Sequence, residues 1–179
     1  DVDQEITYQA ISTKAASKME LGKKFYSWAF FLPQSQTWVA NSSDAQEYIH
    51  QSLIEYVSDS NAWKNASATY FWPKQGKLTF FAVSDNTSAG CTIADGDAYL
   101  NCTKTDGVAI GNFSVTNNMN KDLLVAKISA DQTQNTTTAS TWELGVPTVF
   151  YHILSAIEVK AQTTADYYSS GAEIKIQNI

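Results

Sequence analysis

Two histidines and two cysteines are the residues of this chain best suited to acid–base, nucleophilic or metal chemistry. Nucleophilic catalysis needs a base held beside a nucleophile, and neither His50 nor His152 lies in a motif that would provide one, such as a Gly-x-Ser-x-Gly elbow or a papain-like cysteine context. His152 lies between Tyr151 and Ile153 in an apolar stretch, which favours a hydrogen-bonded structural imidazole. We therefore predict that the chain has no catalytic residue and is not an enzyme.

The spacing of these residues does not favour metal binding either. Zinc requires clustered His and Cys ligands, and no histidine lies near Cys91 or Cys102 in the sequence. Calcium could be chelated by the acidic residues around the cysteines, which are Asp85, Asp95, Asp97 and Asp106. Their Asp-Gly-Asp run lacks the ordered ligand positions of an EF-hand loop, so we expect no metal and no cofactor.

The two cysteines are instead expected to form a disulfide. Cys91 and Cys102 would close a loop of about a dozen residues and contribute about 3 kcal/mol in the chain-entropy description. The intervening residues resemble a surface hairpin, and the composition resembles that of an exported protein, where disulfides persist. The alternative is a pair of buried reduced thiols.

Five tryptophans offer a second kind of site, because exposed indole rings can stack on sugars. Trp28 and Trp72 lie in apolar stretches and are expected in the core. Carbohydrate binding is favoured if Trp38, Trp63 and Trp142 prove exposed on one face. An enzyme would be favoured only if carboxylates converged in a deep cleft.

Composition limits the class of protein and of partner. Of 179 residues, 44% are hydrophobic and 17% charged, which is typical of a folded chain and far from the composition of disordered segments. The net charge is −6 and all twelve basic residues are lysines, without a basic cluster for nucleic acid to bind. No apolar run approaches the length needed to span a bilayer, so we expect no membrane insertion of this segment.

Short apolar or alternating runs between turn signals predict an all-β fold, a β-sandwich. In the stretch from Thr69 to Val83, two strand-like runs flank Pro73 and Gly76, which predict a turn. A helical stripe and a capping-box pattern that begins at Asp44 allow one short helix before residue 52.

The first strand-like run lies near the N-terminus and is expected to form a replaceable edge strand. In Glu5–Ile11, the side chains of Ile6, Tyr8 and Ala10 alternate onto one face and would be buried against the core. The polar stretch Ser12–Lys24 follows and is expected to be an exposed tether. Loss of such a strand would expose backbone groups and apolar slots that another extended segment could fill.

Several of these segments, in their order along the chain, give it a family resemblance. Residues 5–10, 69–83, 122–126 and 150–160 together resemble the fimbrillin-like family, the type V pilus subunits of Bacteroidales. The resemblance implies a lipoprotein precursor exported to the outer membrane, with two transthyretin-like, Greek-key β-sandwich domains in tandem. Residues 1–179 would then be the N-terminal domain alone. It also implies a structural role in a cell-surface fimbrium that supports adhesion, with other fimbrial subunits or further copies as partners and host or bacterial surfaces as ligands.

In that family the subunits polymerise by strand exchange, and the first strand is commonly removed by a protease that cuts after arginine in the following loop. This sequence contains no arginine. Processing after Lys14, after Lys18, or not at all therefore stays open, as does the choice among shaft, tip and anchor subunit.

Overall fold

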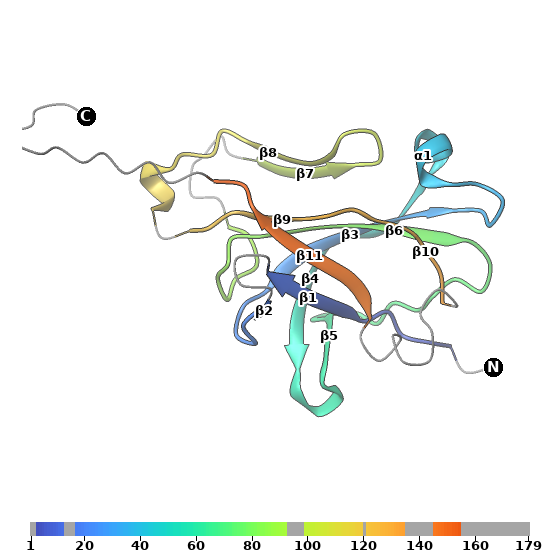
Figure 1. The fold of residues 1–179 in the computed structure, drawn as a ribbon, viewed down its shortest axis with the longest axis horizontal. Helices are drawn as coiled ribbons and strands as arrows, with labels where there is room; N and C mark the ends of the chain where they lie inside the picture. Colours follow the sequence, from blue (N-terminus) through green and yellow to red (C-terminus); the bar gives the residue numbers. More distant parts are fainter. Residues whose placement is uncertain (1–2, 13–16, 93–98, 120, 135–144, 155–179) are drawn as a thin grey trace, which may run out of the picture.

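The computed structural model describes residues 3–12, 17–92, 99–119, 121–134 and 145–154 (Figure 1). Strands dominate these residues, which confirms the predicted all-β, sandwich-like fold. In chain order the elements are β1 (Tyr8–Ser12), β2 (Ser17–Lys18), β3 (Phe25–Leu32), α1 (Trp38–Asn41), η1 (Ser42–Asp44), β4 (Gln46–Val57), η2 (Ser58–Ser60), β5 (Ala62–Asn65), β6 (Lys77–Ser84), β7 (Tyr99–Thr103), β8 (Gly107–Gly111), η3 (Thr116–Asn118), β9 (Leu124–Ala126), β10 (Ser129–Gln132) and β11 (Val146–His152).

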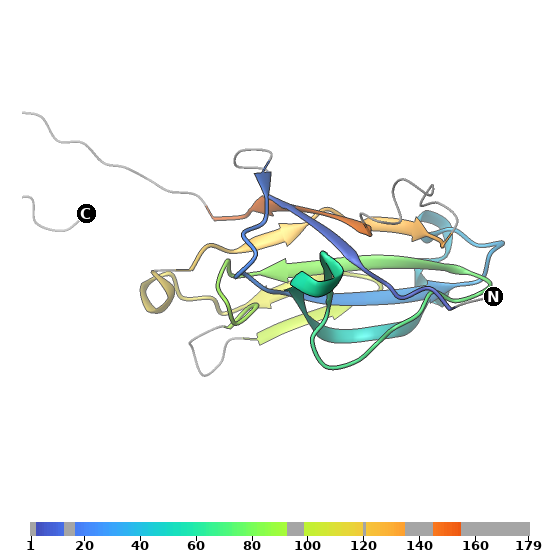
Figure 2. The ribbon, with the colours of Figure 1, turned by 90° about the horizontal axis from the view of Figure 1, so that it is seen from below.

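The main sheet closes on itself. Its strands pair in the order β10-β6-β3-β4-β5-β1-β11-β9, and β9 also pairs with β6. Strands β1 and β11 consequently lie over β3 and β6 as a second layer, as the two views in Figures 1 and 2 show. Strand β5 joins the layers on one side and β9 joins them on the other.

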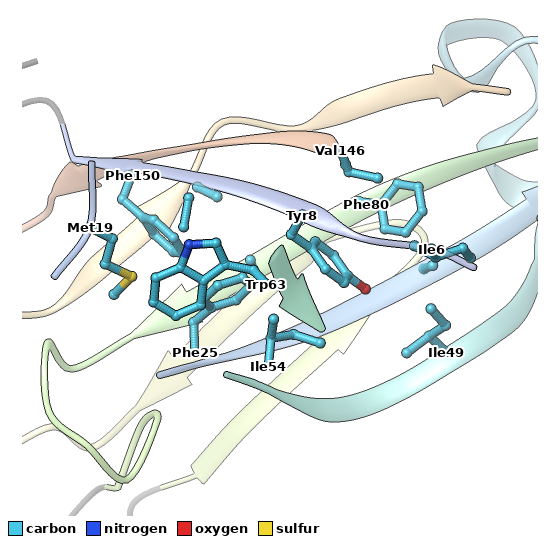
Figure 3. Packing of buried hydrophobic residues seen from close by; sticks show 14 of the residues in the cluster. Ile6, Tyr8, Met19, Phe25, Ile49, Ile54, Trp63, Phe80, Val146 and Phe150 are labelled. Atoms are coloured by element: carbon cyan, nitrogen blue, oxygen red, sulfur yellow. The ribbon is translucent and has the colours of Figure 1, made fainter. Parts of the chain in front are cut away.

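The larger core fills the space between these layers (Figure 3). It receives one face of β3 and β6, because side chains alternate along a strand. Phe25 and Phe150 have no exposed surface, and their rings meet edge to face with centroids 5.2 Å apart. The fully or nearly fully buried members are Ile6, Tyr8, Ala10, Met19, Phe25, Ala29, Ile49, Ile54, Trp63, Trp72, Leu78, Phe80, Ala82, Leu124, Ala126, Val146 and Phe150.

A second core lies on the opposite face of β3 and β6. There Trp28, Phe30 and Phe81 pack beneath the separate β7–β8 hairpin and α1. Burial on both faces explains why β3 and β6 are continuous apolar runs in the sequence rather than alternating ones.

The predicted turn before β6 is confirmed at Gly76. Its φ is +110°, a conformation that favours glycine, and an added Cβ would collide with the ring of Phe31. The chain then re-enters the sheet as β6, paired with β3 along its length.

The one short helix allowed before residue 52 is present as α1, but it ends before Asp44, so the capping-box pattern at Asp44 does not mark its start. The residues that follow enter β4, which pairs with β3 and then with β5. The helical stripe arises because β4 has an irregularity at Gln51, where φ is +36°, so that the buried side chains Ile49 and Ser52 are three residues apart. The one α-helix among the described residues is α1, which comes earlier and is four residues long.

Candidate functional site

Strand β1 has neighbours on both flanks. On one side it runs parallel to β11 over five residue pairs, from Tyr8 opposite Val146 to Ser12 opposite Phe150. On the other side the partners change along the chain: residues 4–6, which precede β1, bond to 70–72, Tyr8 pairs with Trp63, and residues 11–12 pair with β2.

The expectation of an edge strand therefore differs from the sheet that is observed. Periodicity identifies a strand and its buried face but does not identify its neighbours. Here β11 lies along one flank of β1, and on the other flank the 70–72 segment, also distant in sequence, pairs with residues 4–6 just before β1. We call the space that residues 4–12 fill the β1 slot, and release of β1 means release of these residues. Whether β1 can be replaced stays a prediction.

The buried face of β1 is the one predicted. Ile6, Tyr8 and Ala10 are each no more than 3% exposed. The Tyr8 ring points into the larger core (Figure 3) and packs edge to face on Phe25 and Phe80, with centroids 5.7 and 5.8 Å away. Burial raises the pKa of the Tyr8 phenol, which keeps it neutral. Two large side chains and a small one thus shape the slot.

Two grooves flank the thin contact between β1 and β5. One has a volume of about 410 Å³ and the other about 390 Å³, and both are bordered by Asn61 and Ala62. The first is mainly apolar and is lined by Tyr8, Gln9, Ala10, Met19, Glu20, Leu21, Tyr56, Asn61, Ala62 and Trp63. The second groove is lined mainly by polar residues and contains the Lys64–Glu5 ion pair, with 2.5 Å between Nζ and Oε2. Along this flank β1 is therefore held less continuously than along β11.

The predicted tether leads from β1 back to β3. Lys14 lies outside the described residues, whereas Lys18 lies in β2, opposite Ile11. Farther along, Leu21 is 57% exposed, and Lys24 is fixed to Glu55 by an ion pair of 2.7 Å. The tether is thus held at its β3 end by Lys24, and the residues between β2 and Lys24 include the exposed Leu21.

Cys91 and Cys102 both lie in the second core, and both are free thiols in this structure. Burial raises the pKa of each to about 12, so both are neutral at ordinary pH. The predicted disulfide is thus not formed here and stays a prediction for the exported protein.

The tryptophans do not gather as a sugar platform would require. Trp38 packs on Phe81 in the second core, with ring centroids 5.5 Å apart. Trp63 is 6% exposed in the larger core, where it contacts Tyr56. These two indoles therefore belong to opposite faces of the sheet, and Trp142 lies outside the described residues.

Both histidines have a carboxylate partner, which sequence reasoning missed. His152 Nδ1 lies 2.8 Å from Asp122 Oδ1, and this contact joins the end of β11 to the residues before β9. The exposed His50 contacts Glu47, three residues earlier. A spacing of thirty residues, as between Asp122 and His152, leaves no local signal.

Of the proposed calcium ligands, Asp85 is fully buried and Asp106 is exposed, while Asp95 and Asp97 lie outside the described residues. The Asp85 carboxylate accepts hydrogen bonds from the backbone and hydroxyl groups of Thr87 and Thr92. Within the described part of the chain, no group of three or more His, Cys, Asp or Glu side chains could hold a metal ion. There, too, no helix is long and apolar enough to cross a membrane.

Comparison with known proteins gives one match. A sequence profile described as fimbrillin-like matches residues 13–179, which is most of the chain and begins just after β1. No curated protein and no solved structure matches. The order of segments that suggested this resemblance and the β-rich fold agree with the profile, and the chain belongs to the fimbrillin-like family.

Proposed function

We propose that this chain is a structural subunit of a bacterial surface fimbrium and assembles with other fimbrial subunits by exchange of β1. Membership of the fimbrillin-like family supports the fimbrial role. Export to the cell surface as a lipoprotein precursor, support of adhesion, and a position as the N-terminal domain of a longer protein are parts of the same proposal.

The observation that carries the exchange of β1 is the insertion of residues 4–12 between β11 on one side and the 70–72 segment and Trp63 on the other, all distant in sequence. If residues 4–12 left together, β11 and the 70–72 segment would each present unpaired backbone groups, and the larger core would open at the places of Ile6 and Tyr8. Such a slot pairs an extended segment on two sides, which is stronger than addition at a single edge.

Loss of β1 costs free energy, so the exchange requires an incoming donor strand. Burial of a large apolar side chain contributes roughly 1.5–3 kcal/mol, so loss of Ile6 and Tyr8 alone would cost several kcal/mol. Cleavage of the tether after Lys14 or Lys18 would make β1 a separate peptide without weakening its contacts. An incoming strand must then supply equivalent side chains, which couples release of β1 to assembly.

Carbohydrate binding remains a second candidate because one groove fits it. The 410 Å³ groove combines Tyr56 and Trp63 with the amides of Gln9 and Asn61, and ligand sites have this size and mixed lining. A sugar bound in this groove would contact Trp63 but not Trp38. Titration with bacterial or host-type oligosaccharides, followed by tryptophan fluorescence, tests it.

The fimbrial proposal is tested on the natural full-length protein. Protease treatment that cuts after lysine should remove the first strand, and the trimmed subunits should then form polymers visible by electron microscopy. An uncut control should stay monomeric. Trimmed subunits that never associate would contradict exchange of β1, and a tip or anchor role would become the better hypothesis.

A further inference from the structure

Met19 is a buried side chain within the stretch predicted to be an exposed tether. It is 4% exposed and belongs to the larger core, as does Trp63 (Figure 3). Residues 20 and 21, which follow it, are exposed. The tether therefore enters the core at Met19 before it reaches β3.

Met19 lies beside Ala10 on the inner face of β1. The antiparallel register that pairs Ile11 with Lys18 continues to Ala10 and Met19, and Met19 N donates a hydrogen bond to Ala10 O at 3.1 Å. Opposed residues share a face in an antiparallel pair. A large, flexible side chain from the tether thus lies next to the smallest of the three inward side chains of β1.

The groove of about 410 Å³ reaches this pair of residues. Ala10 and Met19 both line it, together with Tyr8 and Trp63, and its lining is mainly apolar. Because Tyr8 and Ala10 belong to β1 itself, the groove is continuous with the β1 slot. This continuity favours an incoming strand over a free sugar as the occupant of the groove.

The turn between β4 and β5 creates the groove. The register that pairs Tyr8 with Trp63 would place Ala10 opposite Asn61. Asn61 instead has a left-handed φ of +50° at the end of η2, and β5 begins only at the next residue. Strand β5 therefore does not reach the level of Ala10, where the backbone of Met19 takes its place.

We propose that this groove is the pocket for a bulky apolar side chain, such as leucine, that an incoming strand of another fimbrial subunit carries at the level of Ala10, and that Met19 is a plug that withdraws when β1 leaves. The inference rests on the proposed exchange of β1. A donor strand with such a side chain would bury apolar surface that β1 leaves unused, and this difference gives the exchange its direction. A strand identical to β1 would gain nothing over it.

Cleavage after Lys18 would loosen the plug. Hydrolysis of the Lys18–Met19 bond leaves a carboxylate on Lys18, and the Met19 nitrogen, which as an amide donates to Ala10 O, becomes a charged amine. A charged group is costly to bury without a partner of opposite charge. The cut would therefore weaken the hold of Met19 on the core in the same step that frees β1.

A double-mutant cycle in the uncut chain tests whether Met19 occupies the room beside Ala10. In the native background, Ala10→Leu should overpack the core and lower the melting temperature. In the Met19→Ala background, the same leucine should raise it by about 2–4 °C, because the plug is gone. Thr7→Leu, whose side chain alternates away from the core, should act equally in both backgrounds. Additive effects of Ala10→Leu and Met19→Ala would overturn the role of Met19.

Peptide competition tests the pocket itself, on protein whose tether has been cut by limited trypsin. A labelled peptide with the sequence of residues 4–12 reports occupancy of the slot, and unlabelled peptides with Ala10→Leu or Thr7→Leu compete for it. We expect the Ala10→Leu peptide to compete about tenfold better than the native sequence and the Thr7→Leu peptide to stay within about threefold of it. The cut Met19→Ala protein should show the same advantage for leucine at position 10.

Entry of the native peptide without an advantage for Ala10→Leu would overturn the pocket, leave exchange of β1 intact and leave the groove to the sugar hypothesis. A labelled native peptide that never enters the slot would overturn the exchange and this inference with it. An advantage seen only with the Met19→Ala protein would mean that Met19 stays in place after the cut, which would overturn its role as a removable plug.

Discussion

Tyr8 and Trp63 form the one residue pair through which β1 meets β5 in the described sheet. Both side chains enter the larger core, where each packs on Phe25, at 5.7 Å between ring centroids in either case. Phe25 thus connects a strand proposed to leave with a hairpin that stays.

Replacement of Tyr8 should be among the most destabilising changes in β1. Tyr8→Ala removes a buried ring and leaves a cavity between Phe25 and Phe80, so we expect the free energy of unfolding to fall by about 3 kcal/mol. The neighbouring Gln9→Ala, in the same strand with a half-buried side chain, should cost less than about 1 kcal/mol. Urea unfolding measures both, and equal losses would contradict the packing described for Tyr8.

Asp131 should stabilise the second core through the backbone of α1. Both of its carboxylate oxygens accept a hydrogen bond from Trp38 N, at 3.0 and 3.1 Å, and its own φ is +54°. Asp131→Ala loses the acceptor and strains the left-handed backbone, so it should lower the free energy of unfolding by about 1–2 kcal/mol. Asp131→Asn keeps an acceptor and tolerates this φ, so thermal unfolding should separate the two variants; equal melting temperatures would contradict the role.

Strands were largely predictable from the sequence, whereas their neighbours were not. The run 78–83 and the turn at Gly76 have local signals, since turn residues and β-branched or aromatic residues act over a few positions. The position of the short helix was not predictable, because an irregularity at Gln51 imitates helical spacing in what is β4, while α1 lies before Asp44.

Contacts between segments that are distant in sequence also could not be predicted. The position of β1 beside Val146–Phe150, the separation of Trp38 from Trp63, and the Asp122–His152 contact depend on which strands meet. Alternation within one segment gives no information about that choice.

The predicted Cys91–Cys102 disulfide can be decided by alkylation in urea without reductant. If the bridge forms on export, protein isolated from an oxidising compartment should take up no label, and its mass should rise by two alkyl groups only after reduction. Two labels without reductant would show that the thiols remain free, as in this structure.

In the reduced form, the same thiols predict a loss of stability at high pH. Their folded pKa values are raised from 9.0 to about 12, so between these values the folded chain binds more protons than the unfolded one. Stability is therefore full below pH 9 and falls above it, by up to about 1.4 kcal/mol per pH unit for each thiol. Urea unfolding between pH 9 and 10 measures the slope, and the double variant Cys91→Ala, Cys102→Ala should flatten it. If the double variant keeps the same dependence of unfolding free energy on pH, groups other than these two thiols cause it.

Proteolysis tests the tether on which release of β1 depends. Trypsin can cut this chain only after lysine, and a bond must leave local structure to enter a protease. Lys77 pairs with Leu32 where β6 begins and its Nζ donates to Gln36 O at 3.0 Å, and Lys127 N donates to Val149 O at 2.8 Å, so both should be cut late.

Lys18 lies in a two-residue strand that, within the described part of the chain, pairs with β1 alone. So short a pairing should open at little cost. We therefore expect the first cuts after Lys14 or Lys18, with Lys23 and Lys24 following because Lys24 is fixed to Glu55. Peptide mapping of Lys14→Gln and Lys18→Gln would assign the first cut, since each variant should delay only its own product. A first cut after Lys77 or Lys127 would mean that the sheet opens before the tether does, and β1 would then be a permanent strand of the sandwich.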